Sequence, residues 1–151
     1  MVTLEQIIAA RTVDFHAGRL NCAESVLLIM SEYYGWDNAA VPRIATAFGG
    51  GIAGMQGVCG AYTGGAMVIG MLMGREVGGD RMPAVEACKA LHEFFLSLYG
   101  AADCRGILRD VDLSDPAQNA AFRAEDGKHA SVCEPMVAAV CRYLAERYPR
   151  G

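Results

Sequence analysis

The stretch GGGIAGMQGVCGAYTGGAMVIGMLMG, residues 49–74, decides the fold. It closes a run of 31 residues, 44–74, that holds ten glycines and no charged side chain. Its more apolar half, residues 58–74, has 17 residues, fewer than the ~20 apolar residues that cross a membrane, so we do not expect a membrane-spanning helix. We predict instead a central helix over residues 58–74 with neighbours on all sides, in which Gly60 and Gly64 let another backbone approach closely.

Two helix starts precede this stretch. Apolar residues recur there at helical spacing, and strand-type alternation is hard to find. Thr3 with Gln6, and Asn21 with Glu24, form capping boxes, in which each side chain accepts a hydrogen bond from the other residue's backbone N–H. We predict helices that begin at these two caps and run to the next glycine in the sequence.

Three further helices complete the prediction of about six helices in an all-α, compact bundle around the glycine-rich central helix. They are a short helix from Pro42, a helix from Pro83 to Gly100, and a last helix that opens around Ser131 with Glu134 as its capping partner. Residues 103–108 are expected to form a single turn or short helix, and residues 110–130 a loop. Their apolar spacing predicts that Ile44, Ala45, Phe48 and Leu98 face inward.

Length and composition favour a single domain over residues 1–151. The chain has a mass of 16.1 kDa, 53% hydrophobic residues and a formal net charge of −4, and one domain usually spans ~100–200 residues. An acidic chain without a basic run is not expected to bind nucleic acid or anionic lipid. Glu5 and Arg11 interrupt any secretory signal at the start of the sequence, so we expect a cytoplasmic protein.

Six cysteines are the main chemical feature of the sequence. In a reducing cytosol they are better explained by metal or redox chemistry than by structural disulfides. No two stand at CxxC spacing, which excludes a zinc finger, a thioredoxin-type motif and a haem-attachment motif. Any site that several of them share must therefore be assembled by the tertiary structure.

The predicted helix boundaries divide the cysteines into two groups. Cys88 and Cys141 fall in mid-helix on apolar stripes, where a cysteine behaves as a small hydrophobic residue. The other four fall in predicted first turns: Cys22, Cys59, Cys104 and Cys133. Because a helix start carries unpaired N–H groups and a partial positive charge, we expect these four thiols to be biased toward thiolate.

Four thiolates at one site repel each other unless they share a cation or are oxidised in pairs, which leaves three possibilities. An iron–sulfur cluster takes four cysteine ligands. A structural zinc takes the same ligands, typically from closely spaced pairs. Alternatively, two dithiols cycle between reduced and disulfide forms. In the first two cases the four cysteines are metal ligands, and in the third they are the catalytic residues.

Other candidate sites are weaker. The glycine-rich stretch lacks the Lys and Ser/Thr of a phosphate-binding loop, and we expect Gly57, Gly60 and Gly64 to expose backbone beside a cluster or disulfide at Cys59. His129 could serve as a base or ligand, but its charged surroundings predict a solvated loop histidine. His16 and His92 have no partner in the sequence.

The sequence resembles the C-GCAxxG-C-C family of redox-active proteins. The resemblance covers nearly all of the chain and rests on Cys22 in NCAESV, on the segment CGAYTG that begins at Cys59 after the glycine-rich FGGG, and on two later isolated cysteines. It implies a small, mostly helical protein whose four characteristic cysteines are Cys22, Cys59, Cys104 and Cys133. Similar domains accompany haem in some cytochromes, but this chain has no haem-attachment motif.

The function expected from the residues and the resemblance together is redox. We favour an iron–sulfur cluster used in electron transfer or redox sensing, with a thiol–disulfide oxidoreductase next, and a zinc-stabilised or metal-free interaction module as the third possibility. The resemblance also implies a membrane transporter as a partner, beside an unidentified redox partner. Since a second subunit could cover the apolar central helix, we expect a homodimer.

Overall fold

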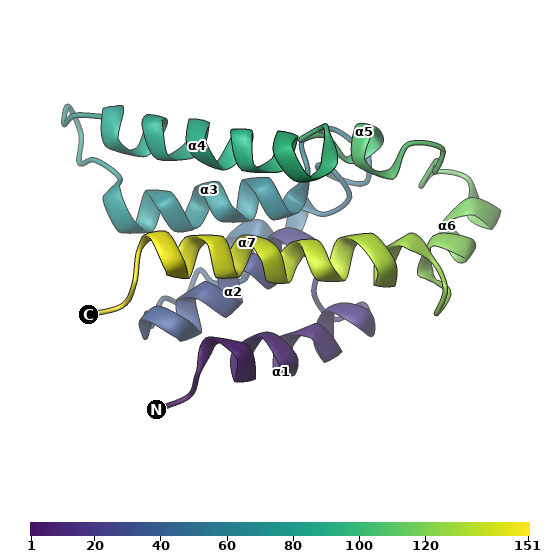
Figure 1. Ribbon diagram of the computed structural model, residues 1–151, viewed down its shortest axis with the longest axis horizontal. Helices are drawn as coiled ribbons and strands as arrows, with labels where there is room; N and C mark the ends of the chain where they lie inside the picture. The colour runs from purple at the N-terminus through teal and green to yellow at the C-terminus, as the bar shows by residue number, and fades with distance from the viewer.

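The computed structural model describes all residues, 1–151, and is all-α. The elements in chain order are α1 (Leu4–His16), α2 (Cys22–Tyr34), the 3-10 helix η1 (Arg43–Phe48), α3 (Gly60–Met73), α4 (Met82–Tyr99), α5 (Cys104–Leu108), α6 (Pro116–Arg123), the π-helix η2 (His129–Cys133) and α7 (Glu134–Arg147). The five long helices lie side by side along the long axis of the molecule (Figure 1). No helix combines the length and the apolar character that a membrane span needs.

Local sequence signals account for the start of α1 and α2. Thr3 and Gln6 exchange the two hydrogen bonds of a capping box, and Asn21 and Glu24 do the same. Helix α2 ends at Gly35, which adopts a left-handed conformation with φ 74°, as a glycine after a helix does most easily. Both predicted capping boxes are confirmed.

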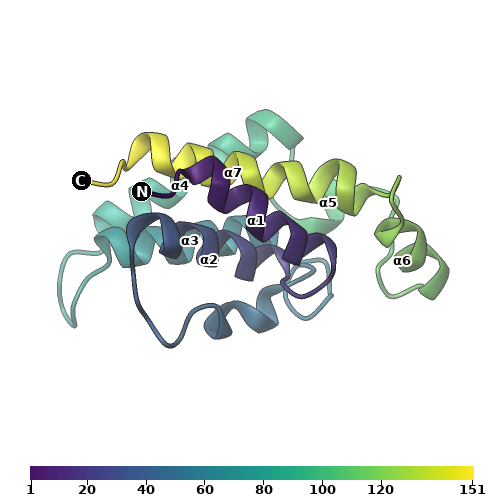
Figure 2. The same cartoon turned by 90° about the horizontal axis from the view of Figure 1, so that it is seen from below.

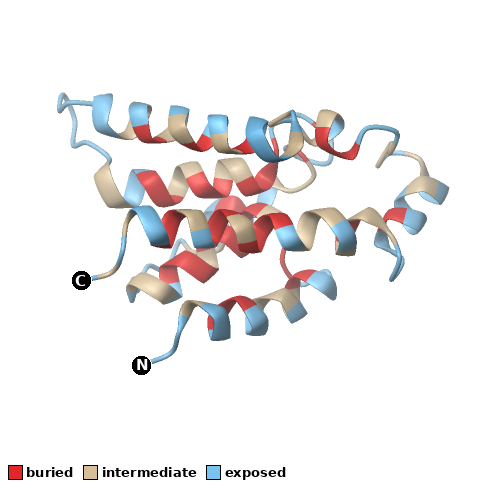
Figure 3. Ribbon diagram, in the orientation of Figure 1, coloured by how far each residue is buried: buried red, intermediate tan, exposed pale blue.

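Helix α3 occupies the centre of the bundle, as predicted for the glycine-rich segment. It packs against α2, α4 and α7, while α1 covers the other side of α2 and α7 (Figures 1 and 2). Buried residues concentrate on α2, on α3 and on the inner faces of α4 and α7, and the outer faces of α1 and α4 are exposed (Figure 3). The residues without measurable exposure include Val26, Ile29, Val68, Ile69, Leu91, Phe95, Val140 and Leu144.

Several sequence predictions are wrong in detail. Ile44 is 60% exposed and Leu98 is 52% exposed, although both were expected to face inward. Ile44 belongs to a 3-10 helix in which Ala45 is the one buried residue. On α4 the buried positions recur every four residues, from Ala87 through Leu91 to Phe95, so the stripe continues toward position 99 and leaves Leu98 outside it.

The segment 110–130 is not a continuous loop, because it contains α6. Asp115 caps this helix by accepting hydrogen bonds from the N–H groups of Ala117 and Gln118, and Pro116 occupies its first position. An Asp–Pro pair at a helix start is a recognisable signal. The predicted start of the last helix at Ser131 is also wrong, since helical structure begins at His129 and Ser131 makes no cap.

Candidate functional site

The structure brings four cysteines to one pocket. The pocket has a volume of ≈ 290 Å³, and the residues that line it include Cys22, Cys59, Cys104 and Cys133. All six cysteines of the chain are free thiols. A volume of this size is far above the ~10–15 Å³ that one water molecule needs, so the pocket has room for a group of several atoms.

The up-and-down course of the chain explains why the four cysteines meet. Both chain termini lie at one end of the bundle, and α5 and α6 lie at the opposite end (Figure 1). Helices α2, α3 and α7 all begin at that opposite end and run back toward the termini (Figure 1). Cys22 and Cys59 stand at the start of α2 and α3, and Cys133 directly precedes α7.

A short backbone pairing holds Cys59 and Cys104 in place. Val58 and Asp103 form an isolated antiparallel β-bridge. The N–H of Cys59 donates to the carbonyl of Ala102 at 2.9 Å, and the N–H of Cys104 donates to the carbonyl of Gly57 at 2.7 Å. The two cysteines are 45 residues apart in sequence, so this pairing is a tertiary feature with no local signature.

The Cys22 thiol lies against bare backbone. A Cβ atom at Gly60 would overlap its sulfur, which means that only glycine fits at this point of contact between α2 and α3. Burial raises the pKa of the Cys22 thiol, and nearby backbone groups of Gly50, Ala23 and Gly60 oppose that rise; those of Ala61 and Tyr62 oppose it at Cys59. Backbone groups therefore lie close enough to two of the four sulfurs to favour their charged form.

The expectation that helix starts bias these thiols toward thiolate is wrong for the metal-free pocket. Burial raises the pKa of the Cys59 thiol to about 12 and that of Cys104 to about 11, with the nearby Cys22 as the next cause. Burial also raises the pKa of Cys22 and of Cys133, although backbone hydrogen bonds oppose the rise at Cys22. The cost of desolvating a thiolate therefore outweighs its stabilisation by the partial positive charge of the helix start.

The placement of Cys133 differs from its prediction. The helical run begins at His129, so Cys133 is the last residue of the π-helix rather than part of a first turn that starts at Ser131. Ser131 is exposed and forms no cap, so it does not hold a helix start at the pocket. Cys22, Cys59 and Cys104 do stand at helix starts, as expected.

Of the three glycines expected beside the site, Gly60 lines the pocket and the other two do not. Gly64 lies one turn further along α3, where its missing side chain lets α3 pack on Ala23 of α2. Gly57 contributes its carbonyl to the pairing with Cys104. The pocket wall comes instead from the preceding loop, which supplies Gly49, Gly50, Gly51 and Gly54.

The four sulfurs share the pocket without forming a single-ion site. Only one group of three or more His, Cys, Asp or Glu residues has ligand atoms that all lie within 4.8 Å of one another, and it contains no cysteine. Tetrahedral zinc with Zn–S bonds of ~2.3 Å would hold its sulfurs ~3.8 Å apart. The cysteines are thus spaced more widely than one zinc ion requires.

The remaining two cysteines lie away from the pocket. Cys141 has no exposed surface and belongs to the hydrophobic core on α7, as its mid-helix position predicts. Cys88 is half-buried on α4 and packs against the same core. Neither lines the pocket.

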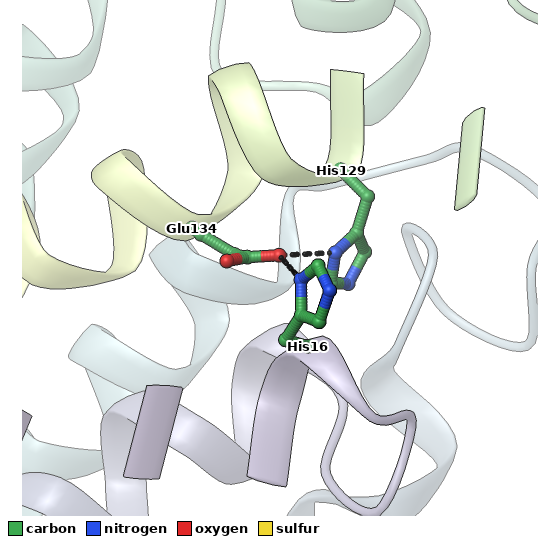
Figure 4. A group of neighbouring side chains, drawn as sticks. All are labelled: His16, His129 and Glu134. Atoms are coloured by element: carbon green, nitrogen blue, oxygen red, sulfur yellow. Dashed lines mark hydrogen bonds and ion pairs between the residues drawn. The ribbon is translucent and has the colours of Figure 1, made fainter. Parts of the chain in front are cut away.

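His129 is the site residue that the sequence misplaced. It is buried, with 4% exposure, and lines the pocket, so the expectation of a solvated loop histidine is wrong. Its Nδ1 lies 2.9 Å from Oε2 of Glu134, and Nδ1 of His16 lies 2.8 Å from the same oxygen (Figure 4). These three residues are the group whose ligand atoms lie within 4.8 Å.

Aromatic side chains fix the plane of the His129 ring. The ring centroid lies 4.4 Å from that of Phe15 and 5.4 Å from that of Phe122. Burial lowers the pKa of His129, against the opposing effect of the hydrogen bond to Glu134. The ring is accordingly neutral near pH 7 and carries one N–H.

A protein-family model matches residues 20–147 of the chain, and the family is described as "Putative redox-active protein (C_GCAxxG_C_C)". The matched range includes all four pocket cysteines and His129, and it excludes His16. No curated protein and no solved structure matches the chain.

Proposed function

This chain belongs to the C_GCAxxG_C_C family, and we propose that its four-cysteine pocket binds an iron–sulfur cluster used in electron transfer or redox sensing. The observation that carries the proposal is the presence of four free thiols around one pocket of ≈ 290 Å³. Cys22, Cys59, Cys104 and Cys133 are the residues that would hold the cluster. Such a cluster supplies reversible one-electron chemistry.

The chemistry of the donors fits this group. Iron–sulfur clusters are held by thiolates, and hydrogen bonds to the sulfurs tune their potential. Backbone groups near Cys22 and Cys59 favour the charged form of both thiols, against the larger opposing effect of burial on their pKa. Each thiol releases its proton when it becomes a ligand, and iron then supplies the positive charge that the metal-free pocket lacks.

The raised thiol pKa values argue against the thiol–disulfide alternative. Attack on a disulfide requires a thiolate, and thiol groups with pKa values of about 12 at Cys59 and about 11 at Cys104 are almost fully protonated at neutral pH. Zinc is disfavoured by a separate observation, namely that no three of the sulfurs lie within 4.8 Å of one another.

Anaerobic metal analysis tests the proposal. The full chain is reconstituted with ferrous iron and sulfide, desalted, and assayed for both together with its visible absorption. We expect near-stoichiometric iron and sulfide and a brown protein. Cys59→Ser should lose most of this iron, whereas the matched control Cys88→Ser, which removes a thiol outside the pocket, should keep it.

Two results would contradict the proposal. A colourless protein that retains zinc in air would support a structural zinc site. A protein without metal whose thiol titre changes reversibly with reductant would support a thiol–disulfide oxidoreductase. Far-UV circular dichroism of both variants checks that a loss of iron does not reflect unfolding.

A further inference from the structure

Arg123 is the only Lys, Arg, Asp or Glu residue among those that line the four-cysteine pocket. The histidine of the lining, His129, is neutral near pH 7, because burial lowers the pKa of its ring. None of the ion pairs in the structure involves Arg123. The pocket therefore borders one cation, and no carboxylate of the protein pairs with it.

Helix α6 places Arg123 at the wall of the pocket. Arg123 is the last residue of α6 and directly follows Phe122, which is buried and lines the pocket as well. The guanidinium carbon Cζ lies 6.0 Å from the centroid of the Phe122 ring, and this centroid lies 5.4 Å from that of His129. The positive charge thus lies beside the part of the wall that α6 and η2 form.

The pKa values of the pocket thiols support this placement. Burial and then the other pocket thiols raise the pKa of Cys133, and the charge of Arg123 opposes the rise. Burial is also the largest cause of the raised pKa at Cys104, where the charge of Arg105 opposes the rise and that of Asp103 adds to it. No such carboxylate offsets Arg123 at Cys133.

An uncompensated cation at this place has a consequence for the cluster proposed above. Four thiolate ligands give an iron–sulfur cluster a net negative charge, which grows when the cluster accepts an electron. A nearby positive charge stabilises the more negative state more strongly, so it raises the reduction potential. The buried apolar residues Ile107, Leu108 and Phe122 line the same pocket, and an apolar wall screens such an interaction less than water does.

A purely structural role of Arg123 is the alternative. A cation in the last turn of a helix interacts favourably with the partial negative charge of the helix end, and Arg123 occupies that turn of α6. This role predicts that loss of the side chain changes the stability of the protein and leaves the reduction potential unchanged. The two roles therefore differ in what a redox titration measures.

We infer that the guanidinium of Arg123 is the counter-charge of the cluster in the four-cysteine pocket and raises its reduction potential. This inference rests on the proposed function. Arg123 is not a ligand, because the four cysteines hold the cluster and the guanidinium acts on it only through its charge. Since Arg123 is exposed, dissolved salt screens this charge in part.

Anaerobic redox titration of the reconstituted full chain tests the inference. Dithionite is added in the presence of mediators while the visible absorption is followed. We expect Arg123→Gln to retain iron and sulfide and to have a more negative potential than the wild-type protein, whereas Arg123→Lys should stay close to the wild-type potential. The difference between the wild-type protein and Arg123→Gln should shrink at about 1 M salt, where the Debye length is only about 3 Å.

The matched control is Arg147→Gln. It makes the same change in net charge, but Arg147 is the last residue of α7, at the end of the bundle opposite to the pocket (Figure 1). Its substitution should leave the potential unchanged. A shift as large as that of Arg123→Gln would show that only the net charge of the protein matters, and it would overturn the specific role of Arg123.

The other outcomes separate the two proposals. Equal potentials in the wild-type protein and Arg123→Gln, with iron and sulfide retained, would overturn the role of Arg123 and leave the cluster in place. Equal shifts in Arg123→Gln and Arg123→Lys would overturn it as well, because lysine keeps the charge. Loss of iron from Arg123→Gln with full retention in Arg123→Lys would support it, since the charge then decides whether the cluster is held. Failure of the wild-type protein to retain iron and sulfide would overturn the proposed function, and this inference with it.

Discussion

At the scale of single residues, burial rather than helix position decides the state of the thiols. Cys22, Cys59 and Cys104 stand at helix starts, where partial positive charge favours a thiolate by only ~0.3–1 kcal/mol. Removing the sulfur from water works in the opposite direction and is the largest influence on the pKa of each of the three. The metal-free pocket therefore holds thiols, and a metal must displace their protons.

A pH series of alkylation tests this conclusion at Cys104. Its pKa of about 11 predicts that reaction of the metal-free, reduced protein with iodoacetamide accelerates about tenfold per pH unit between about pH 7 and pH 10, since only the thiolate reacts. Peptide mass spectrometry follows the residue. The same cysteine in denaturant serves as the control and should level off near its ordinary pKa of ~8.5.

A plateau below pH 8 in the folded protein would contradict the prediction. It would mean that the helix-start N–H groups stabilise a thiolate after all, and it would favour thiol–disulfide exchange over metal binding.

At the scale of elements, the contact between α2 and α3 sets the shape of the pocket. Gly60 and Gly64 lie one turn apart on α3 and face α2. A Cβ atom at Gly64 would lie 2.8 Å from the carbonyl oxygen of Ala23 and 3.1 Å from Cβ of Val26. Backbone surrounds this position, so the helices would have to move apart to accommodate a side chain.

Two alanine substitutions in α3 test the importance of this close packing. Gly64→Ala should lower the free energy of unfolding by about 1–3 kcal/mol, as overpacking of a core does. Gly70→Ala is the matched control, because Gly70 is exposed on the same helix and a Cβ there meets no atom within 4 Å. It should raise the stability by about 0.5–1 kcal/mol through helix propensity.

Urea denaturation measures both effects. Equal changes in the two variants would show that helix propensity alone governs these positions and that α2 and α3 are not in close backbone contact. Gly64→Ala should also weaken iron retention, because it shifts α2 and with it Cys22 at the head of that helix.

At the scale of the whole molecule, the core extends well beyond the pocket, although Phe15, Ala61 and Met136 belong to both. The fully buried side chains lie along the length of α2, α3, α4 and α7, whereas the pocket is confined to the end of the bundle where α2 and α3 begin and where α5, α6 and η2 lie (Figure 1). Most of the apolar burial that stabilises the fold does not depend on what the pocket holds. The chain should therefore fold without a metal.

Chelation gives the corresponding prediction. Removing the metal from the reconstituted protein should leave the helical far-UV circular dichroism unchanged and lower the Tm by about 5–10 °C, as expected for a ligand present at about 100 times its Kd. Cys59→Ser should show no such difference between the treated and untreated samples. Loss of helical signal on chelation would show that the metal holds the fold together, as in a zinc finger.

The fold was predictable wherever a signal lies within a few residues. Thr3 with Gln6 and Asn21 with Glu24 mark the starts of α1 and α2, and Gly35 marks the end of α2. Helix α6 is not predicted, because the charges around it favour a loop. Its start nevertheless carries a local signal, since Asp115 is the N-cap and Pro116 the first helical residue. Ser131 suggested a cap that does not form, since the chain is already helical from His129.

The site was predictable in its cysteines and not in its histidine. The sequence by itself determined the helical periodicity, the caps and the division of six cysteines into two core residues and four at or near helix starts, because each of these depends on neighbours within one or two turns. Only the tertiary structure decided that the thiols are protonated and that His129 is buried beside them. Those properties depend on desolvation and on contacts such as that of His129 with Phe15, which residues distant in sequence create only when the helices pack.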